Sequence, residues 1–365
     1  MIFLGLEISS IATYVLAGYR RSDIKSNESA IKYFVLGSFA TAFLLYGMAL
    51  IYGATGTTNL EQIKNAVSNN FNAATNQTLP IELLFIGAAL MLIGFGFKIA
   101  TAPFHFWTPD VYDGAPTPVT AFMAAGPKAA GFAAFLRVFV LTFSIGYSTD
   151  LHVVWASSLE SIAILTMIVG NIAAISQTNL KRMLAYSSIA HAGYALVGFL
   201  ADDWTSVAFY MLTYSVMNMG SFAIVELFSG RDGKTDLDSY AGFGFKNLGI
   251  SIAMLVFMLS LAGVPLTGGF MGKFMLFRAA WDKGLHTLVI VAVLNSAVSV
   301  YYYLRPMVVM FFRESNDSSI SIPAIPKSLI AVIVISLIGT LYLGILPGKI
   351  MELLENSRQL ITLVN

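Results

Sequence analysis

The sequence contains no cysteine, and charged residues make up only 11% of its 365 positions. Without cysteine, the chain can form no disulfide and can hold no iron–sulfur cluster through thiolate ligands, so any electron transfer must take place in another polypeptide. The four histidines are scattered without the spacing of a metal-binding motif, and there is no glycine-rich phosphate-binding loop. The absence of such a loop disfavours direct nucleotide hydrolysis.

Hydrophobic residues make up 57% of the chain and are gathered in long runs. A helix needs about 20 apolar residues to cross a bilayer. The runs predict an all-α polytopic membrane protein with ten transmembrane helices at 2–19, 30–53, 81–107, 117–144, 154–176, 186–201, 204–228, 248–278, 285–312 and 327–346. The connections are short, so we expect a single domain over residues 1–365, with a short external helix in the longest connection, 54–79.

The distribution of basic residues predicts the orientation in the membrane. If the amino terminus lies outside, the external loops hold Lys64, Lys283 and little else. The cytoplasmic loops then hold Arg20, Arg21, Lys25, Lys32, Lys181, Arg182, Arg231, Lys234, Lys246, Arg313 and Lys327. Because cytoplasmic loops carry the excess of lysine and arginine, we expect both termini outside. The chain starts directly on an apolar run, so no signal peptide is predicted, and we favour a bacterial inner membrane.

Two of the runs are too long for one membrane crossing and are interrupted. Residues 81–107 would extend about 40 Å as a helix, against a hydrocarbon core of about 30 Å, and they contain Pro103. Residues 248–278 contain Gly263, Pro265, Gly268 and Gly269. Unwound backbone inside a membrane is tolerated where protein buries it or where it lines a wet cavity. A pair of broken helices is typical of inverted-repeat transporters and marks their ion path.

Three lysines stand inside apolar runs. A charge at the bilayer centre costs about 2.5 to 3.5 kcal/mol even on lenient scales, so each lysine is a functional-site hypothesis. Lys98 precedes the first break and Lys273 follows the second, with Glu226 as a more distant acid for Lys273. Either lysine could instead extend to the membrane surface. Lys128 lies too deep in its helix for that, and its alternative is a purely structural ion pair.

Glu7 is the only acid well inside an apolar run in the first half of the chain. We expect it to pair with a lysine, because an opposite charge offsets desolvation. Lys32 is a candidate partner, although its position at a helix end fits simple surface exposure equally well. His105 follows Lys98 by about two turns along the same helical face and would suit a relay between lysines, or it satisfies polar groups at the break.

The stretches PFHFWTPDVYDGAPTPV, TNLKRMLAYSSIAHAGY and LAGVPLTGGFMGKF closely resemble the antiporter-like membrane subunits of respiratory complex I, NADH:quinone oxidoreductase. The opening LGLEISSIATYVLAGYRRSDIKSNESAIKYF is most similar to the subunit N group, which includes mitochondrial and chloroplast subunit 2. The resemblance covers essentially the whole chain. Bacterial members have further helices at their amino end, so the sequence is expected to lack those helices.

The resemblance implies a subunit that translocates protons while other subunits oxidise NADH and reduce quinone. Matched by motif, the proton path falls on Glu7, Lys32, Lys98, Lys128 and Lys273, with His105 as an accessory. No cofactor is implied in this chain; flavin, iron–sulfur clusters and quinone belong to partner subunits. The implied partners are the bilayer and other membrane subunits of complex I, especially neighbouring antiporter-like subunits, and no nucleic acid. The alternatives are a multisubunit cation/proton antiporter and a non-pumping structural subunit.

Overall fold

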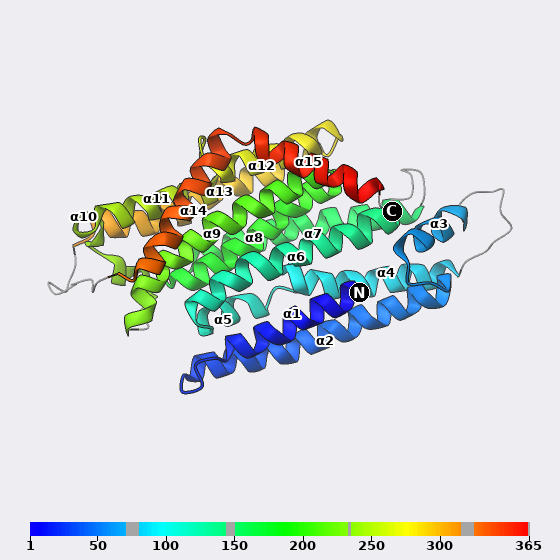
Figure 1. Ribbon diagram of the computed structural model, residues 1–365, viewed down its shortest axis with the longest axis horizontal. Coiled ribbons are helices and arrows are strands. Elements are labelled where there is room, and N and C mark those ends of the chain that lie inside the picture. The colour runs from blue at the N-terminus through cyan, green and yellow to red at the C-terminus, as the bar shows by residue number, and fades with distance from the viewer. Residues whose placement is uncertain (71–79, 144–149, 233–234, 315–324, 364–365) are drawn as a thin grey trace.

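A computed structural model of the chain describes residues 1–70, 80–143, 150–232, 235–314 and 325–363. Within these ranges the chain is helical and has no β-strand, apart from one isolated antiparallel bridge between Asn179 and Asp236. Most of the long helices run roughly along the longest axis of the molecule (Figure 1). The expected all-α fold is confirmed.

In the described part of the chain, eight helices are long and apolar enough to cross a membrane. They are α2 (Ile24–Thr55), α4 (Ile81–Ile99), α6 (Thr117–Phe143), α7 (Asp150–Ile175), α8 (Leu180–Leu200), α9 (Trp204–Asp232), α13 (His286–Phe312) and α14 (Lys327–Ile345). The shorter elements are α1 (Ile2–Ala17), α3 (Leu60–Asn70), α5 (Trp107–Gly114), η1 (Leu237–Tyr240), α10 (Phe243–Lys246), α11 (Leu248–Ala262), α12 (Gly268–Asp282) and α15 (Gly348–Leu363). Each of the ten predicted spans therefore has a helical counterpart.

Some predicted boundaries were wrong because polar caps extend a helix beyond its apolar run. The expected span 186–201 begins earlier, at Leu180, because the Asn179 side chain accepts a hydrogen bond from the Arg182 amide at 3.1 Å. In α2 the Asp23 side chain caps the start in the same way. Such caps satisfy amide groups that the helix itself leaves free. The helix α15 was not predicted, since its polar and apolar residues alternate around the helix and leave no long apolar run.

The first predicted break lies between α4 and α5, over residues 100–106. Ala100 takes a left-handed conformation with φ of 60°, which ends α4. The indole N–H of Trp107 donates to the Phe97 carbonyl at 3.0 Å, and the Thr101 amide donates to the Gly96 carbonyl at 2.9 Å. The carbonyl groups freed at the end of α4 are thus satisfied within the protein, as backbone inside a membrane requires.

The second predicted break separates α11 from α12. Gly263 ends α11 with φ of 92°, a conformation that glycine adopts without steric cost. Its amide donates to the Leu259 carbonyl at 3.0 Å, so the last turn of α11 closes normally. The last carbonyl groups of α11, of Leu261 and Ala262, accept hydrogen bonds from a side chain of α12.

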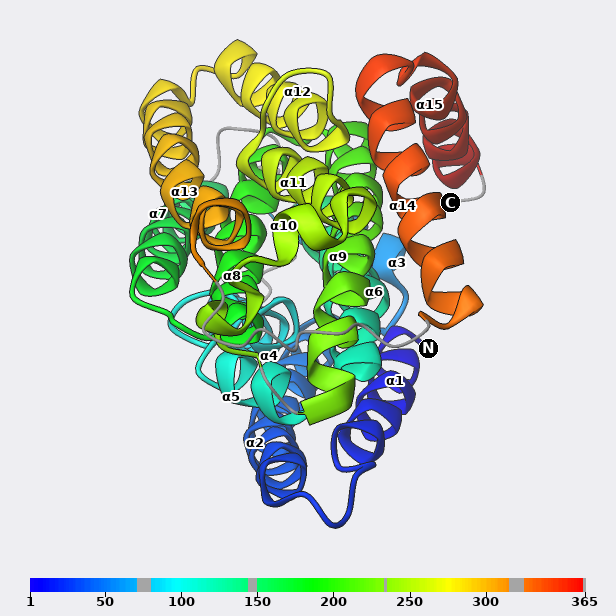
Figure 2. The same ribbon diagram turned by 90° about the vertical axis from the view of Figure 1, so that its left-hand side faces the viewer.

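The end-on view shows how the helices are layered around the bundle (Figure 2). The helices α8 and α9 lie near its middle, and nearly every side chain of α8 is buried. The helices α1 and α2 lie on one side, while α12, α13 and α14 lie on the others. Many apolar side chains on α1, α2, α13 and α14 are exposed, as on a surface that faces lipid.

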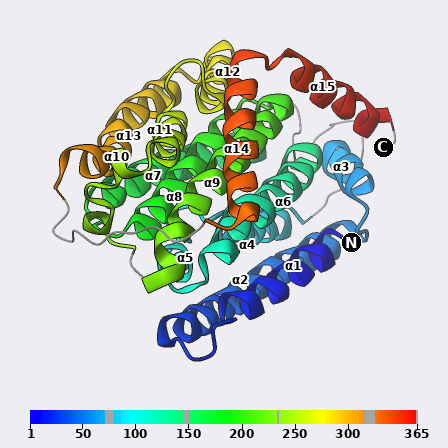
Figure 3. The ribbon, with the colours of Figure 1, turned by 60° about the vertical axis from the view of Figure 1, so that its left-hand side comes forward.

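The two ends of the bundle differ. The short helices α5 and α10 and the turn between α1 and α2 lie toward one end (Figures 1 and 3). The helix α3, the start of α1 and the end of α15 lie toward the other. The short helix expected in the 54–79 connection is present as α3.

Candidate functional site

The Glu7 side chain on α1 meets the Lys98 side chain on α4. The Lys98 Nζ lies 2.9 Å from the Glu7 Oε1, and both side chains are mostly buried. Lys98 also donates a hydrogen bond to the Ser10 hydroxyl, and Thr41 of α2 donates to Glu7 at 2.9 Å. A buried acid and a buried amine thus neutralise one another between three helices.

Glu7 was expected to pair with a lysine, and it does, but Lys32 as its partner was wrong. Glu7 lies opposite Thr41 on α2, and Lys32 is about 13 Å further along that helix at 1.5 Å per residue. Lys32 instead contacts Asp110 of α5 at 2.7 Å and Glu28 at 2.6 Å, and its side chain is 40% exposed.

Asp110 accepts hydrogen bonds from two basic side chains. One oxygen contacts Lys32, and the other contacts the Arg182 guanidinium of α8 at 2.8 Å. Burial raises the pKa of Asp110, but its hydrogen bonds with Lys32 and Arg182 outweigh burial and hold that pKa below its usual value. Asp110 is therefore a carboxylate at neutral pH.

Lys128 on α6 is deeply buried, with 4% of its surface exposed. Its Nζ donates to the carbonyl oxygen of Ser188 on α8 and to the Ser188 hydroxyl, the latter at 2.6 Å. The amine also lies 5.6 Å from the centre of the Tyr214 ring. Lys128 forms no ion pair within the described ranges. The alternative of a purely structural ion pair at Lys128 therefore has no counterpart among the described residues.

His191 on α8 follows Ser188 by about one helical turn and is fully enclosed. Its Nε2 lies 3.0 Å from the Tyr303 hydroxyl, and its Nδ1 lies 2.7 Å from the Tyr210 hydroxyl. Tyr303 also hydrogen-bonds the Ser187 hydroxyl. The ring centre lies 4.9 Å from that of Tyr214, the ring beside Lys128, and 5.7 Å from that of Tyr194, the ring beside Lys273. His191 therefore lies between the surroundings of two buried amines.

His191 was not predicted as a site residue. The signal was present, because His191 lies among apolar and small residues in AYSSIAHAGY. The reasoning that picked out lysines inside apolar runs applies equally to a histidine there.

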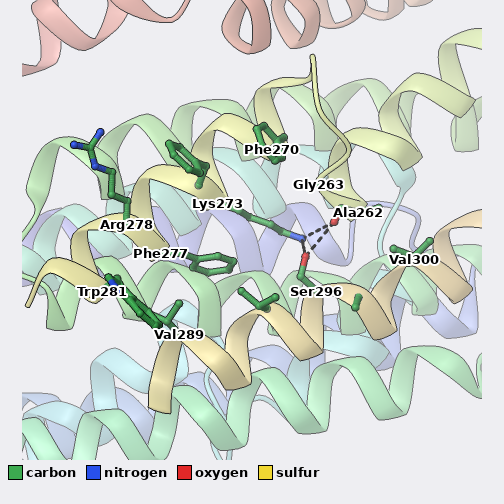
Figure 4. A pocket seen from close by; sticks show the side chains of 13 residues that line it. Ala262, Gly263, Phe270, Lys273, Phe277, Arg278, Trp281, Val289, Ser296 and Val300 are labelled. Atoms are coloured by element: carbon green, nitrogen blue, oxygen red, sulfur yellow. Dashed lines mark hydrogen bonds between the residues drawn. The ribbon is translucent and has the colours of Figure 1, made fainter. Parts of the chain in front are cut away.

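Lys273 extends from α12 toward the carbonyl end of α11 (Figure 4). Its Nζ donates to the Leu261 carbonyl at 2.9 Å, to the Ala262 carbonyl at 3.1 Å and to the Ser296 hydroxyl of α13 at 2.9 Å. The carbonyl end of α11 is the negative end of its helix dipole, so it stabilises the Lys273 ammonium. The more distant acid suggested by the sequence, Glu226, accepts a hydrogen bond from Ser229 and is not among the partners of Lys273.

Polar groups continue beyond Lys273. Its Nζ lies 4.6 Å from the centre of the Tyr194 ring, and the Tyr194 hydroxyl accepts from the Asn171 side chain at 3.2 Å. Asn171 accepts from the Tyr302 hydroxyl at 2.8 Å and contacts the Asn295 amide oxygen at 3.2 Å. Side chains from α7, α8, α12 and α13 thus form a connected polar cluster in an apolar bundle.

A pocket of about 590 Å³ between α12 and α13 leads to Lys273 (Figure 4). Lys273 and Ser296 lie in its wall, and the remaining wall is mostly apolar, with Phe270, Phe277 and Val289 among its residues.

His105 lies in the first break, where the chain is not helical. The expectation that His105 shares a helical face with Lys98 was therefore wrong, since the helical spacing ends at Ile99. The ring is buried and stacks on Phe106, with centroids 4.7 Å apart. Its Nδ1 has no hydrogen-bond partner in the part of the chain that the structure describes. Across the same ranges, no group of three His, Asp or Glu side chains could hold a metal ion.

The comparisons with known proteins agree with one another. The family described as "NADH:quinone oxidoreductase/Mrp antiporter, TM" matches residues 1–299. The chain is 51% identical over 365 residues to NADH-quinone oxidoreductase subunit N of Trichlorobacter lovleyi. The match covers 99% of this chain and 72% of that relative.

Two solved structures share the fold. A chain of respiratory complex I from Thermus thermophilus is 37% identical with a TM-score of 0.78, and the match covers 96% of this chain and 74% of that one. A chain of the Mrp complex from Dietzia sp. DQ12-45-1b has a TM-score of 0.83 at 23% identity, covering 96% and 72%, and shows the likeness of fold alone.

Proposed function

The chain belongs to the NADH:quinone oxidoreductase/Mrp antiporter family of membrane subunits, and from this premise we propose that it is the proton-translocating N-type subunit of a respiratory complex I. The observation that carries the proposal is the succession of amines buried across the bundle, Lys98, Lys128 and Lys273. Each contacts groups that stabilise a proton without fixing it permanently, namely one carboxylate, hydroxyls and backbone carbonyls.

The first part of the proposed path is the pair Glu7 and Lys98. While the pair is closed, the carboxylate stabilises the protonated amine. If Glu7 turns away, the buried ammonium loses its counter-charge, and release of its proton becomes favourable. The hydroxyls of Ser10 and Thr41, which contact the pair, can accept or donate at that moment.

The second part runs from Lys128 through His191 to Lys273. An imidazole can take a proton on one nitrogen and release one from the other, so its place between two amines suits a relay. The Tyr303 and Tyr210 hydroxyls contact the two nitrogens and extend the reach of the ring in opposite directions. At Lys273 the α11 carbonyls and the Ser296 hydroxyl stabilise the charged form.

Energy for the transfer would come from partner subunits. We propose that flavin, iron–sulfur clusters and quinone are bound there, and that the neighbours of this chain are the other antiporter-like membrane subunits of the complex. Residues 1–365 would act as one proton-translocating domain in a bacterial inner membrane. The end of the bundle with α5 and the α1–α2 turn would face the cytoplasm, because it holds Arg20, Arg21 and Arg182, and both termini would lie outside.

A cation/proton antiporter subunit is the second candidate. The Dietzia Mrp chain supports it at the level of fold, with 23% identity. The 51% identity to a subunit N favours complex I. Co-purification separates the two: flavin and iron–sulfur partners support complex I, whereas Na⁺/H⁺ exchange without them supports the antiporter.

The replacement Lys128→Met in the assembled complex tests the proton path. Methionine keeps the length of the side chain but holds no proton, so we expect proton pumping in membrane vesicles to be lost while the complex still assembles. Pumping at the wild-type ratio of protons to electrons would reject the relay and leave the non-pumping structural role.

A further inference from the structure

The half-helix α5 is held between α2 and α8 by side chains from both. On the α2 side, the Ser29 hydroxyl donates to the Val111 carbonyl at 3.0 Å, and Lys32 contacts the Asp110 carboxylate at 2.7 Å. On the α8 side, Arg182 contacts the other Asp110 oxygen at 2.8 Å. One carboxylate of α5 is thus shared by two helices that are not adjacent in the sequence.

The carbonyl end of α5 is held from α8 as well. The Lys181 Nζ donates to the Asp113 carbonyl at 2.9 Å and to the Ala115 carbonyl at 2.7 Å. The Asn179 amide donates to the Asp113 carboxylate at 3.0 Å. An ammonium at the carbonyl end of a helix is stabilised by the helix dipole. Lys181 is buried, so these bonds are shielded from water.

The backbone of α5 lies directly against the start of α2. A Cβ added to Gly114 would overlap the carbonyl oxygen of Lys25 and approach the Ser29 Cβ at 2.9 Å. Glycine at this position allows the close approach. The close approach of α5 to α2 keeps Lys32 within reach of the Asp110 carboxylate.

Because α5 directly follows the first break, contacts that hold α5 also affect the proposed proton path. The break begins just after Lys98, so the position of α5 sets the course of the chain leaving the Glu7–Lys98 pair. Arg182 stands on the same rigid helix as Ser188, the partner of Lys128. A shift of α5 relative to α8 would thus change the spacing between the two parts of the proposed path.

We propose that Lys32 and Arg182 are positioning residues that share the Asp110 carboxylate and hold α5 between α2 and α8, and that Lys32 acts through a fixed positive charge and carries no proton. The inference rests on the proposed function, because the groups that it positions are those of the proposed proton path. It assigns Lys32 a different role from the one implied by the sequence resemblance.

Three observations support a fixed charge at Lys32. It contacts two carboxylates, of Asp110 and Glu28, which together stabilise its ammonium form. It is far more exposed than Lys98, with 40% of its side chain accessible against 8%. It makes no contact with Glu7, whose partners are Lys98 and Thr41.

The replacements Lys32→Arg and Lys32→Met in the full complex separate a fixed charge from a proton carrier. Arginine keeps the charge but does not release its proton in proteins. We expect Lys32→Arg to keep the wild-type proton-to-electron ratio and pH profile of pumping. We expect Lys32→Met to lower the ratio about two- to fivefold, as the loss of a partly exposed ion pair allows. Equal impairment of both variants would overturn the proposal.

A double replacement tests whether Lys32 acts through Asp110. We expect Asp110→Asn to lower the ratio as Lys32→Met does, and the double variant to be no worse than Asp110→Asn alone, since both remove the same contact. A further loss in the double variant would overturn the proposal. Lys25→Met is the control, because Lys25 contacts Asp113 at 3.5 Å and is 68% exposed. If Asp110→Asn fails to assemble, the arginine replacement decides the matter.

Failure of this inference is distinguishable from failure of the proposed function. Wild-type pumping in Lys128→Met would reject the proton path whatever the Lys32 variants do. Lost pumping in Lys128→Met together with equal loss in Lys32→Arg and Lys32→Met would keep the path and place Lys32 in it.

Discussion

Glu7 and Lys98 form an ion pair of 2.9 Å across a separation of 91 residues, between a helix at the start of the chain and the last turn before the first break. The pair joins the only buried acid of α1 to the amine that precedes the unwound segment. Within the described ranges, it is the one contact of the proposed path in which a carboxylate can change the proton affinity of an amine.

Loss of the Glu7 carboxylate should disable the first step. In Glu7→Gln the Lys98 ammonium keeps its buried place without a counter-charge, at a cost of about 3 kcal/mol. We expect pumping to be lost in Glu7→Gln and partly kept in Glu7→Asp, as measured in vesicles beside NADH oxidation. The exposed Glu61 of α3 supplies the control, Glu61→Gln, which should pump normally. Normal pumping in Glu7→Gln would remove this pair from the path.

Replacement of the His191 imidazole should interrupt proton transfer between Lys128 and Lys273. His191→Phe keeps an aromatic ring but removes both hydrogen bonds, to Tyr303 and Tyr210. We expect proton pumping to fall at least as far as in Lys128→Met. Tyr303→Phe, which removes one of the two bonds, should give a smaller loss. If His191→Phe pumped at the wild-type ratio, the relay would have to bypass the ring.

The helices α11 and α12 lie so close together at Gly269 that a side chain there should not fit. A Cβ there would overlap the Ser260 carbonyl oxygen, and a backbone group cannot move aside cheaply. We expect Gly269→Ala to destabilise the subunit by about 3 kcal/mol or more and to lower the amount of assembled complex. Gly249→Ala in α11 meets no atom within 4 Å and should assemble normally. Blue native gels of solubilised membranes measure both.

The contribution of Asp110 to stability should be independent of pH near neutrality. Its pKa lies below the usual value in the folded protein, so the pairs with Lys32 and Arg182 contribute fully above the unfolded pKa of about 3.9. That contribution is lost only as the pH falls through the lower folded-state pKa.

We therefore expect the gap in thermal stability between wild type and Asp110→Asn to stay constant between about pH 5 and 8. Asp282→Asn, which removes an exposed pair with Arg278 at 3.8 Å, should show almost no gap. A gap for Asp110→Asn that varied within this range would mean that another titrating group controls the contact.

The membrane-spanning helices and both breaks could be predicted from the sequence because their signals are local. Apolar runs mark the spans, while Pro103 and Gly263 mark the interruptions. Lys98 and Lys128 stood out for the same reason, since a charge in an apolar run is visible without knowledge of its neighbours.

The partners of these residues could not be predicted in this way. Lys98 rather than Lys32 meets Glu7 because of the register between α1 and α2, which places Thr41 opposite the acid. Serine hydroxyls and helix carbonyls as partners, as at Lys273, give no signal in the sequence at all. His191 was overlooked although its sequence signal was available.

The side chain of Trp107 ties together the two arms of the first interrupted helix. It begins α5, donates to the Phe97 carbonyl of α4, and stacks on Tyr33 of α2 with ring centroids 4.4 Å apart. These contacts fix the direction in which the chain leaves α4. We therefore expect proton transfer at the neighbouring Glu7–Lys98 pair to depend on rotation of side chains and not on hinge motion of the backbone at this corner.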